Sequence, residues 1–171
     1  MKTGCISADF IVNSDSKKNT IIEGYASVFD IADNHNDMIV KGAFKSSSSN
    51  RVKLLWQHDV TKPIGVITTL LEDGYGLKLE AEINNKTALG AEATALVKQG
   101  AVGGLSIGFS IKSSDFDKNG VRVIDDVDLA EISIVTFPAN KHAEINNVKQ
   151  SVFYQKSLNE LENLIKQLED Y

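Results

Sequence analysis

One segment of helical periodicity stands among long stretches in which apolar and polar residues alternate. Small apolar residues recur at helical spacing within KTALGAEATALVKQG (residues 86–100), namely Ala88, Ala91, Ala95 and Leu96. Gly100 follows where a helix C-terminal cap belongs, so we expect a helix over about residues 86–99. Because strands and helices do not alternate along the chain, the pattern argues against a parallel βαβ sheet and predicts an α+β fold with a mostly antiparallel sheet.

The remaining stretches of the body predict strands joined by polar turns. Alternation or enrichment in β-branched and aromatic residues predicts strands at residues 5–12, 20–29, 51–57, 64–71, 76–83, 105–116 and 121–137. Asp73-Gly74 predicts a tight hairpin before residues 76–83. We expect HDVTKP (residues 58–63) to be a loop connection, and MIVKGAF (residues 38–44) to lead into a short helical piece.

The C-terminal segment differs from the body. In residues 151–171 the apolar side chains follow a 4-3-4-3 spacing typical of a short coiled-coil seam, at Tyr154, Leu158, Leu161, Ile165 and Leu168. Such a helix is marginal alone in water, so it would either pack on the body or bind a partner or a second copy of the chain. We therefore divide the chain into a folded domain, residues 1–148, and a C-terminal amphipathic helix, residues 149–171.

Composition and charge argue against several classes of protein. The 171 residues suffice for one domain with a hydrophobic core, and the formal net charge of −5 comes without the basic stripe of a nucleic-acid-binding protein. No apolar run approaches the ~20 residues of a membrane span, and the N-terminus lacks the apolar core of a secretory signal. The histidines and the single cysteine, Cys5, lack metal-ligand spacing, so we expect no metal and no other cofactor. Cys5 fits a buried structural thiol.

A serine between two glycines is the first candidate for chemistry. Gly104-Leu105-Ser106-Ile107-Gly108 matches G-x-S-x-G, the nucleophile elbow of α/β-hydrolases. An elbow needs a strand before the serine and a helix after it, whereas here the expected helix comes first and a strand follows. The pattern alone leaves two interpretations. Ser106 is a small residue on a tight turn, or it is a nucleophile that the glycines leave open to a substrate carbonyl.

A nucleophilic serine needs a base and a group that orients the base. His58 follows an apolar strand beside Trp56 and is the first candidate base, although an exposed loop histidine next to Asp59 would give the same sequence. His142 is a second candidate. Glu131 interrupts an apolar strand, and it is either the orienting carboxylate or a side chain on the exposed face of that strand.

Five segments of the chain together resemble the prohead (capsid maturation) proteases of tailed phages, of the HK97 type. They are, in chain order, EGYASVFD, MIVKGAF, LLWQHDVTKPIG, GGLSIGF and VDLAEISIVTFPAN. The resemblance covers about residues 20–142, and the segment after His142 lies outside it. It implies a fold similar to that of the herpesvirus capsid proteases, a mostly antiparallel β-barrel wrapped by a few helices.

The resemblance also implies an activity and roles for three residues. Matched motif by motif, His58 would be the general base, Ser106 the nucleophile and Glu131 the third member of a triad. The implied reaction is peptide-bond hydrolysis through an acyl-enzyme, which makes the chain a serine endopeptidase without a cofactor.

Two further positions follow from the same resemblance. By analogy, backbone N–H groups near Ala139 and Asn140 would stabilise the oxyanion. One departure from the family pattern is Lys141-His142, where relatives commonly continue with a proline. It keeps His142 open as an alternative third member of the triad.

The resemblance places the protein inside a phage prohead that assembles in the cytoplasm of a host bacterium. Its protein substrates would be the major capsid protein and the scaffold, including the protease itself, and no nucleic acid or membrane is expected as a partner. Related viral proteases are typically dimers, so we expect a homo-oligomer, a dimer or higher. An alternative of a different class is a catalytically silent assembly or scaffolding factor with the same fold.

Overall fold

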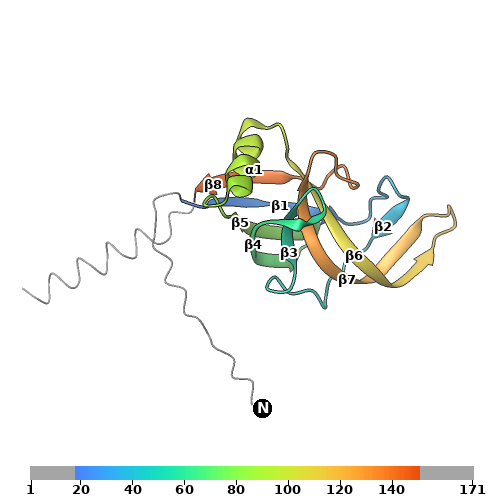
Figure 1. Ribbon diagram of the computed structural model, residues 1–171. Helices are drawn as coiled ribbons and strands as arrows, with labels where there is room; N and C mark the ends of the chain where they lie inside the picture. Colours follow the sequence, from blue (N-terminus) through green and yellow to red (C-terminus); the bar gives the residue numbers. More distant parts are fainter. Residues whose placement is uncertain (1–17, 151–171) are drawn as a thin grey trace, which may run out of the picture.

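Residues 18–150 form an eight-stranded sheet with one helix beside it (Figure 1). The structure is a computed structural model that describes residues 18–150. In chain order its elements are β1 (Thr20–Val28), β2 (Asp37–Ile39), β3 (Lys53–Trp56), β4 (Asp59–Glu72), β5 (Gly76–Ile83), α1 (Ala88–Gln99), β6 (Gly104–Phe116), β7 (Arg122–Val135) and β8 (Ile145–Gln150). The strand-rich α+β class predicted from the alternation is confirmed.

The sheet has the order β2-β7-β3-β4-β5-β1-β8, and β6 pairs with β7 outside this path. Strand β7 therefore carries antiparallel β6 on one edge, and β3 and β2 run parallel to it on the other. The expected closed barrel is wrong. Among the described strands, β8 approaches β6 only through an isolated bridge between Gly104 and Glu144, which does not extend into a ladder. The alternation of side chains cannot reveal this, because open and closed sheets both have one apolar face.

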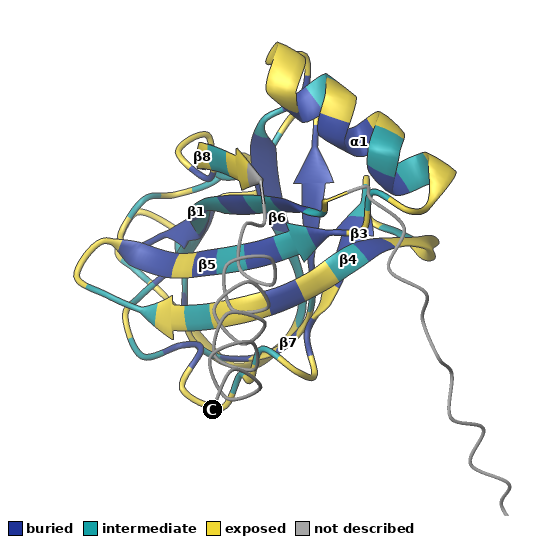
Figure 2. Ribbon diagram, turned by 90° about the vertical axis from the view of Figure 1, so that its left-hand side faces the viewer, coloured by how far each residue is buried: buried dark blue, intermediate teal, exposed yellow. Residues whose placement is uncertain are grey.

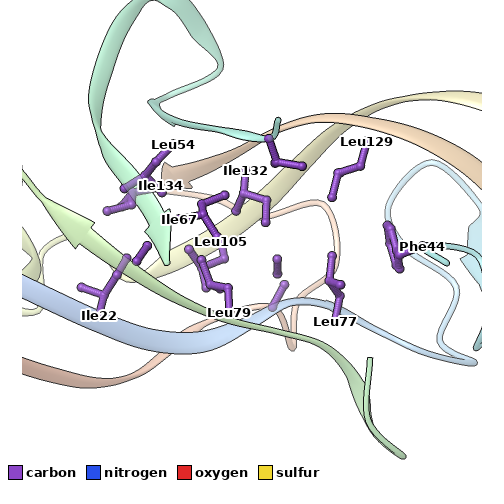
Figure 3. Packing of buried hydrophobic residues seen from close by; sticks show 14 of the residues in the cluster. Ile22, Phe44, Leu54, Ile67, Leu77, Leu79, Leu105, Leu129, Ile132 and Ile134 are labelled. Atoms are coloured by element: carbon purple, nitrogen blue, oxygen red, sulfur yellow. The ribbon is translucent and has the colours of Figure 1, made fainter. Parts of the chain in front are cut away.

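The core lies between the curved layers of this sheet (Figures 2 and 3). Strand β5 shows the principle most clearly, because its four buried side chains alternate with charged ones: Leu77, Leu79, Ala81 and Ile83. Side chains from β1, β3, β6 and β7 meet them, including Ile22, Leu54, Leu105 and Ile132, each 0% exposed. Burial of this kind contributes roughly 1.5–3 kcal/mol per large side chain.

The helix ends where the sequence predicts, before Gly100, and begins at Ala88, two residues after the expected start at 86. The side chain of Thr87 caps its N-terminus by accepting a hydrogen bond from the Gly90 N–H at 3.0 Å. Gly100 ends it in the left-handed region, with φ 80°, where a glycine carries no Cβ penalty. Only one face is buried, through Ala93 and Val97, while the outer face is exposed in Figure 2. The expectation of several helices around the sheet is wrong for residues 18–150, which contain α1 alone.

Two local predictions also differ from the structure. Residues 38–44 do not lead into a helix, because β2 is followed by turns whose Gly42 and Phe44 N–H groups donate to the Glu72 carboxylate at 2.9 and 2.8 Å. The segment 58–63 is not a loop, because β4 begins at Asp59. In the segment after β2, these long-range hydrogen bonds accompany isolated turn bonds, such as that from the Ser47 N–H to the Phe44 carbonyl at 2.8 Å, and no helix forms.

Several predictions fall outside the described residues. They are the strand at 5–12, the environment of Cys5 and the C-terminal amphipathic helix. Strand β8 runs to Gln150, and the division into residues 1–148 and 149–171 stays a prediction. None of the helices within residues 18–150 combines the length and the apolar character needed to cross a membrane.

Candidate active site

The pairing of β6 with β7 brings the candidate serine and carboxylate onto one face of the sheet. Ser106 lies opposite Ser133, and Gly108 lies opposite Glu131. Residues that face each other across an antiparallel pair, and residues two apart along a strand, project to the same side. The G-x-S-x-G pattern therefore belongs to a strand whose serine lies on the same face of the sheet as Glu131, and no nucleophile elbow is present at this position.

The candidate base lies on a two-residue turn between β3 and β4. Gln57 and His58 have φ of 54° and 59°, the positive values at both central positions that a type I′ turn has. Such turns favour Asn-Gly, and neither residue here is a glycine, so the backbone is strained at His58. Gln57 fixes the turn to the end of β7, since its N–H donates to the Ile134 carbonyl at 3.0 Å and its amide donates to Thr136 Oγ1 at 2.9 Å.

The histidine and the glutamate are in contact. Glu131 Oε1 lies 2.5 Å from His58 Nδ1, with the Glu131 side chain 12% exposed and the His58 side chain 42% exposed. The second carboxylate oxygen, Oε2, accepts a hydrogen bond from Ser133 Oγ at 2.7 Å. A carboxylate held in this way fixes the imidazole tautomer, with the proton on Nδ1 and the lone pair on Nε2.

Gly108 makes room for that carboxylate. A Cβ atom at position 108 would overlap Glu131 Oε1 and would lie 2.8 Å from its Cδ. Gly104, at the start of the same strand, is also closely packed, because a Cβ there would lie 2.7 Å from Pro138 Cδ. Both glycines of the motif are thus explained by close packing of the segments that surround Ser106.

Ser106 and His58 line the same cavity, which has a volume of about 420 Å³. Ser106 is 9% exposed, and Phe137 lies on the cavity wall with 90% of its surface exposed. Among the described residues no hydrogen bond joins Ser106 Oγ to His58 Nε2. Catalytic hydrogen bonds are often long in enzymes without substrate and shorten when the substrate binds.

The loop after β7 forms another wall of the cavity, with Ala139 and Asn140 among its lining residues. This loop is fixed from both sides: the Asn34 N–H donates to the Ala139 carbonyl at 3.1 Å, and the Asn140 amide donates to the Val28 carbonyl at 2.9 Å. Within residues 18–150, the backbone N–H groups of Ala139 and Asn140 donate to no other protein group. Free N–H groups beside a candidate nucleophile are what an oxyanion requires.

The other histidines lie differently. His142 is exposed and is not among the residues that line the cavity, and its backbone N–H donates to Asn140 Oδ1 at 3.1 Å. His35 is exposed and lines the cavity. The structure therefore brings Glu131, and not His142, to the ring of His58. Nowhere in the described region of the chain do three or more His, Cys, Asp or Glu side chains gather closely enough to hold a metal ion.

Sequence reasoning missed two residues of this site. Gln57 gave no signal, because its partners lie on β7, far along the chain. Ser133 did give one, since it is a hydroxyl in an apolar strand, two residues from Glu131 and therefore on the same face.

Beside the turn, the Thr61 hydroxyl, and next the Lys62 ammonium, lower the pKa of Asp59 to about 2. Asp59 is thus ionised and fixed next to His58.

Comparison with known sequences places the chain among phage proteins. A family model described as "Caudovirus prohead serine protease" matches residues 8–157. The prohead protease of Enterobacteria phage HK97 is 35% identical over 156 residues, which cover 87% of this chain and 68% of that protein. The prohead protease of Escherichia phage T5 is 31% identical over 145 residues, which cover 81% of this chain and 68% of that protein.

Comparison with solved structures supports the fold. A KSHV protease bound to a hexapeptide phosphonate inhibitor is similar with a TM-score of 0.56 at 9% identity, over 90% of this chain and 78% of that one. The bacteriophage T4 capsid assembly protease is similar with a TM-score of 0.53 at 12% identity, over 67% of this chain and 81% of that one. At these identities the likeness concerns the fold, and the herpesvirus-protease-like chain path predicted from the sequence is confirmed.

Proposed function

Because the chain belongs to the Caudovirus prohead serine protease family, we propose that His58, Ser106 and Glu131 form the catalytic triad with which it hydrolyses peptide bonds. The family gives the chain its role, that of a prohead protease in capsid maturation. The geometry of the site supports the assignment of the three residues, which follows from the motifs of the family. Ser106 is the nucleophile, His58 the general base and Glu131 the residue that orients the base.

One observation carries this assignment. Glu131 Oε1 lies 2.5 Å from His58 Nδ1, and the ring so held lines the same cavity as Ser106. These three side chains come from a turn and two strands far apart in the sequence, and a base oriented by a carboxylate beside a serine is the arrangement of a serine hydrolase. The chain order His, Ser, Glu differs from the Ser, acid, His order of α/β-hydrolases.

In the acylation step, His58 Nε2 takes the proton of Ser106 Oγ while Oγ attacks the carbonyl carbon of the scissile peptide bond. The carbonyl oxygen becomes an oxyanion, which we assign to the free N–H groups of Ala139 and Asn140. Collapse of the tetrahedral intermediate breaks the C–N bond, and His58 gives its proton to the leaving amine. The Glu131 carboxylate stabilises the imidazolium that exists between the two transfers.

In the deacylation step, a water molecule gives a proton to His58 Nε2 and attacks the Ser106 ester. The ester C–O bond then breaks, His58 returns the proton to Ser106 Oγ, and the acid product leaves. Every proton transfer uses the same nitrogen, so no metal or cofactor enters the sequence of steps.

The substrates we propose are the scaffold segment of the major capsid protein, a separate scaffold protein and the protease itself. The setting is the interior of a prohead in the bacterial cytoplasm, where enzyme and substrate share a small volume. High effective concentration then compensates for weak intrinsic catalysis. We further propose that the enzyme is a dimer or higher homo-oligomer and that residues 151–171, which follow β8, form its C-terminal contact helix.

The test is coexpression with the cognate capsid protein, followed by mass spectrometry of that protein. Wild-type enzyme should yield a trimmed product, and Ser106→Ala should abolish it. Ser110→Ala is the matched control, because Ser110 is an exposed serine on the same strand. Unchanged trimming by Ser106→Ala would overturn the assignment. Normal shells together with the absence of trimming by the wild-type chain would instead support the alternative of a silent assembly factor.

A further inference from the structure

A buried serine lies beneath the His58–Glu131 pair. Ser133 is 0% exposed and stands in β7 between Ile132 and Ile134, which are also 0% exposed. A hydroxyl in such surroundings destabilises the fold unless it is hydrogen-bonded, and an alanine would fit the strand without that cost. The hydroxyl of Ser133 is therefore the feature to explain.

The Ser133 hydroxyl makes two hydrogen bonds, one as acceptor and one as donor, and both are to residues of the candidate site. Ser133 Oγ accepts a hydrogen bond from the backbone N–H of His58 at 3.0 Å. It donates its own proton to Glu131 Oε2 at 2.7 Å. Because an N–H can only donate and a carboxylate can only accept, the direction of both bonds is fixed.

The two groups bonded to Ser133 are the backbone of His58 and the carboxylate of Glu131, and the proposed mechanism requires both to be held in position. His58 has a φ of 59° on a turn without glycine, a backbone conformation that persists only where the surroundings hold it. The Glu131 carboxylate reaches His58 with Oε1, so its rotation is fixed only when Oε2 is also held. One hydroxyl thus ties the backbone of the base to the carboxylate that orients its ring.

We propose that Ser133 is a positioning residue for the triad, which sets the distance between His58 Nδ1 and Glu131 Oε1 from beneath. The inference rests on the proposed function, since it has meaning only if His58 is the base. Ser133 lies opposite Ser106 in the β6–β7 ladder, so the residue that positions the base is also the direct cross-strand neighbour of the nucleophile.

Ser133→Ala removes the hydroxyl and creates no overlap. Without it, we expect kcat on a peptide that spans the capsid cleavage site to fall roughly 10- to 100-fold, the cost of misplaced catalytic groups, with KM nearly unchanged. The Nδ1 proton of His58, observed by NMR, should lose its protected signal, because the carboxylate is no longer fixed. Ser133→Thr, which restores a hydroxyl, should recover both the rate and the signal.

Thr20→Val is the matched control for loss of a buried hydroxyl. Thr20 is 0% exposed and accepts a hydrogen bond from the Asn85 amide at 2.9 Å, on β1 and away from His58. It should lower the melting temperature without changing kcat or the His58 signal. Where Ser133→Thr does not fold, the kcat and the proton signal of Ser133→Ala decide the matter.

The outcomes separate the inference from the proposed function. If Ser106→Ala is inactive while Ser133→Ala keeps the wild-type kcat and His58 signal, the positioning role is overturned and the triad stands. If Ser106→Ala still trims, both are overturned. A rise in KM alone for Ser133→Ala would also overturn the positioning role, because it would indicate a substrate contact.

Discussion

The two halves of the β6–β7 ladder have the same pairing but very different surroundings. In the near half, Gly104–Gly108 pair with Glu131–Val135, and β3 pairs with the other edge of β7. In the far half, β6 is exposed from Ser110 to Phe116, and Figure 1 shows both strands extending away from the body. Every candidate catalytic side chain on these strands lies in the near half.

The comparison of the two halves shows which part of the sheet can hold a reactive side chain in a fixed position. In the near half, β6 and β3 pair with the two edges of β7, so Glu131 and Ser133 cannot shift without breaking two ladders. In the far half, β2 pairs with the second edge of β7 only over Arg122–Ile124 and does not reach Asp128. In the far half, Asp128 has only an exposed lysine partner, Lys112, at 4.0 Å. Exposed pairs of this kind contribute little, roughly 0–1 kcal/mol.

The largest expected difference between the halves is in catalysis. Glu131→Gln keeps the shape of the side chain but removes the charge that, in the proposed triad, stabilises the His58 imidazolium. We expect kcat to fall roughly 10³- to 10⁴-fold, the scale seen when the carboxylate of a triad is replaced. Asp128→Asn, on the same strand, should leave kcat unchanged in the same peptide assay. Equal effects of the two substitutions would remove the contrast between the halves.

The next difference is in stability. Ile132→Ala removes a side chain that is 0% exposed in the near half, and we expect the free energy of unfolding to fall by about 3 kcal/mol. Ile111→Ala, in the far half, removes one that is 38% exposed and should cost less than about 1 kcal/mol. Urea denaturation of the two variants measures both values. A larger loss of unfolding free energy for Ile111→Ala than for Ile132→Ala would show that the far half contributes more to the stability of the fold.

A third contrast uses two glycines close to Ser106. Gly108→Ala places a methyl group against the Glu131 carboxylate, which is the free end of a flexible side chain and can move aside. We expect the melting temperature to change little but kcat to fall roughly 10- to 100-fold, because the carboxylate leaves His58. Gly103→Ala is the control, since a Cβ there meets nothing within 4 Å. Retention of full activity by Gly108→Ala would mean that the Glu131 contact is dispensable.

The smallest expected difference is in how Asp59 and Asp117 affect the stability of the protein at acidic pH. Asp59, beside His58, has a pKa lowered to about 2, and the largest cause is the hydrogen bond from the Thr61 hydroxyl. Asp117, in the hairpin at the far end of the ladder, also has a lowered pKa, and the largest cause is the hydrogen bond from the Val121 N–H. A lowered folded pKa gives stability that is present above the unfolded pKa, about 4, and is lost as pH falls through the folded value. Asp59→Asn and Asp117→Asn should each reduce slightly the drop in melting temperature between pH 5 and pH 2.5. Only Asp59→Asn should also lower kcat, because its turn carries His58.

Local signals made several elements of this fold predictable. Alternation and Asp73-Gly74 gave β5 its bounds, and Thr87 and Gly100 cap the helix, because in each case the determining contacts lie within a few residues. The candidate triad is different, because the residues alone left two interpretations for each of its members and the resemblance to the prohead proteases assigned their roles. The contact of Glu131 with His58 is consistent with that hypothesis.

The remaining features depend on contacts between distant segments. The turn at Gln57–His58 has no turn-forming residue, and it is held by hydrogen bonds to Ile134 and Thr136 that no local pattern encodes. The parallel pairing of β3 with β7 and the open edge of the sheet are likewise choices among registers that all bury the same apolar faces.

Strand β7 is made late. When a ribosome has released residues 18–116, the nascent chain already contains both His58 and Ser106, but β3 and β6 are neighbours only through β7, Arg122–Val135. Until that strand is synthesised and inserted between them, the chain lacks Glu131 and the strand that brings together the segments of the proposed base, His58, and the proposed nucleophile, Ser106. If His58, Ser106 and Glu131 form the proposed triad, we expect a chain that has not yet completed β7 to be inactive, so that proteolysis would begin only after folding is complete.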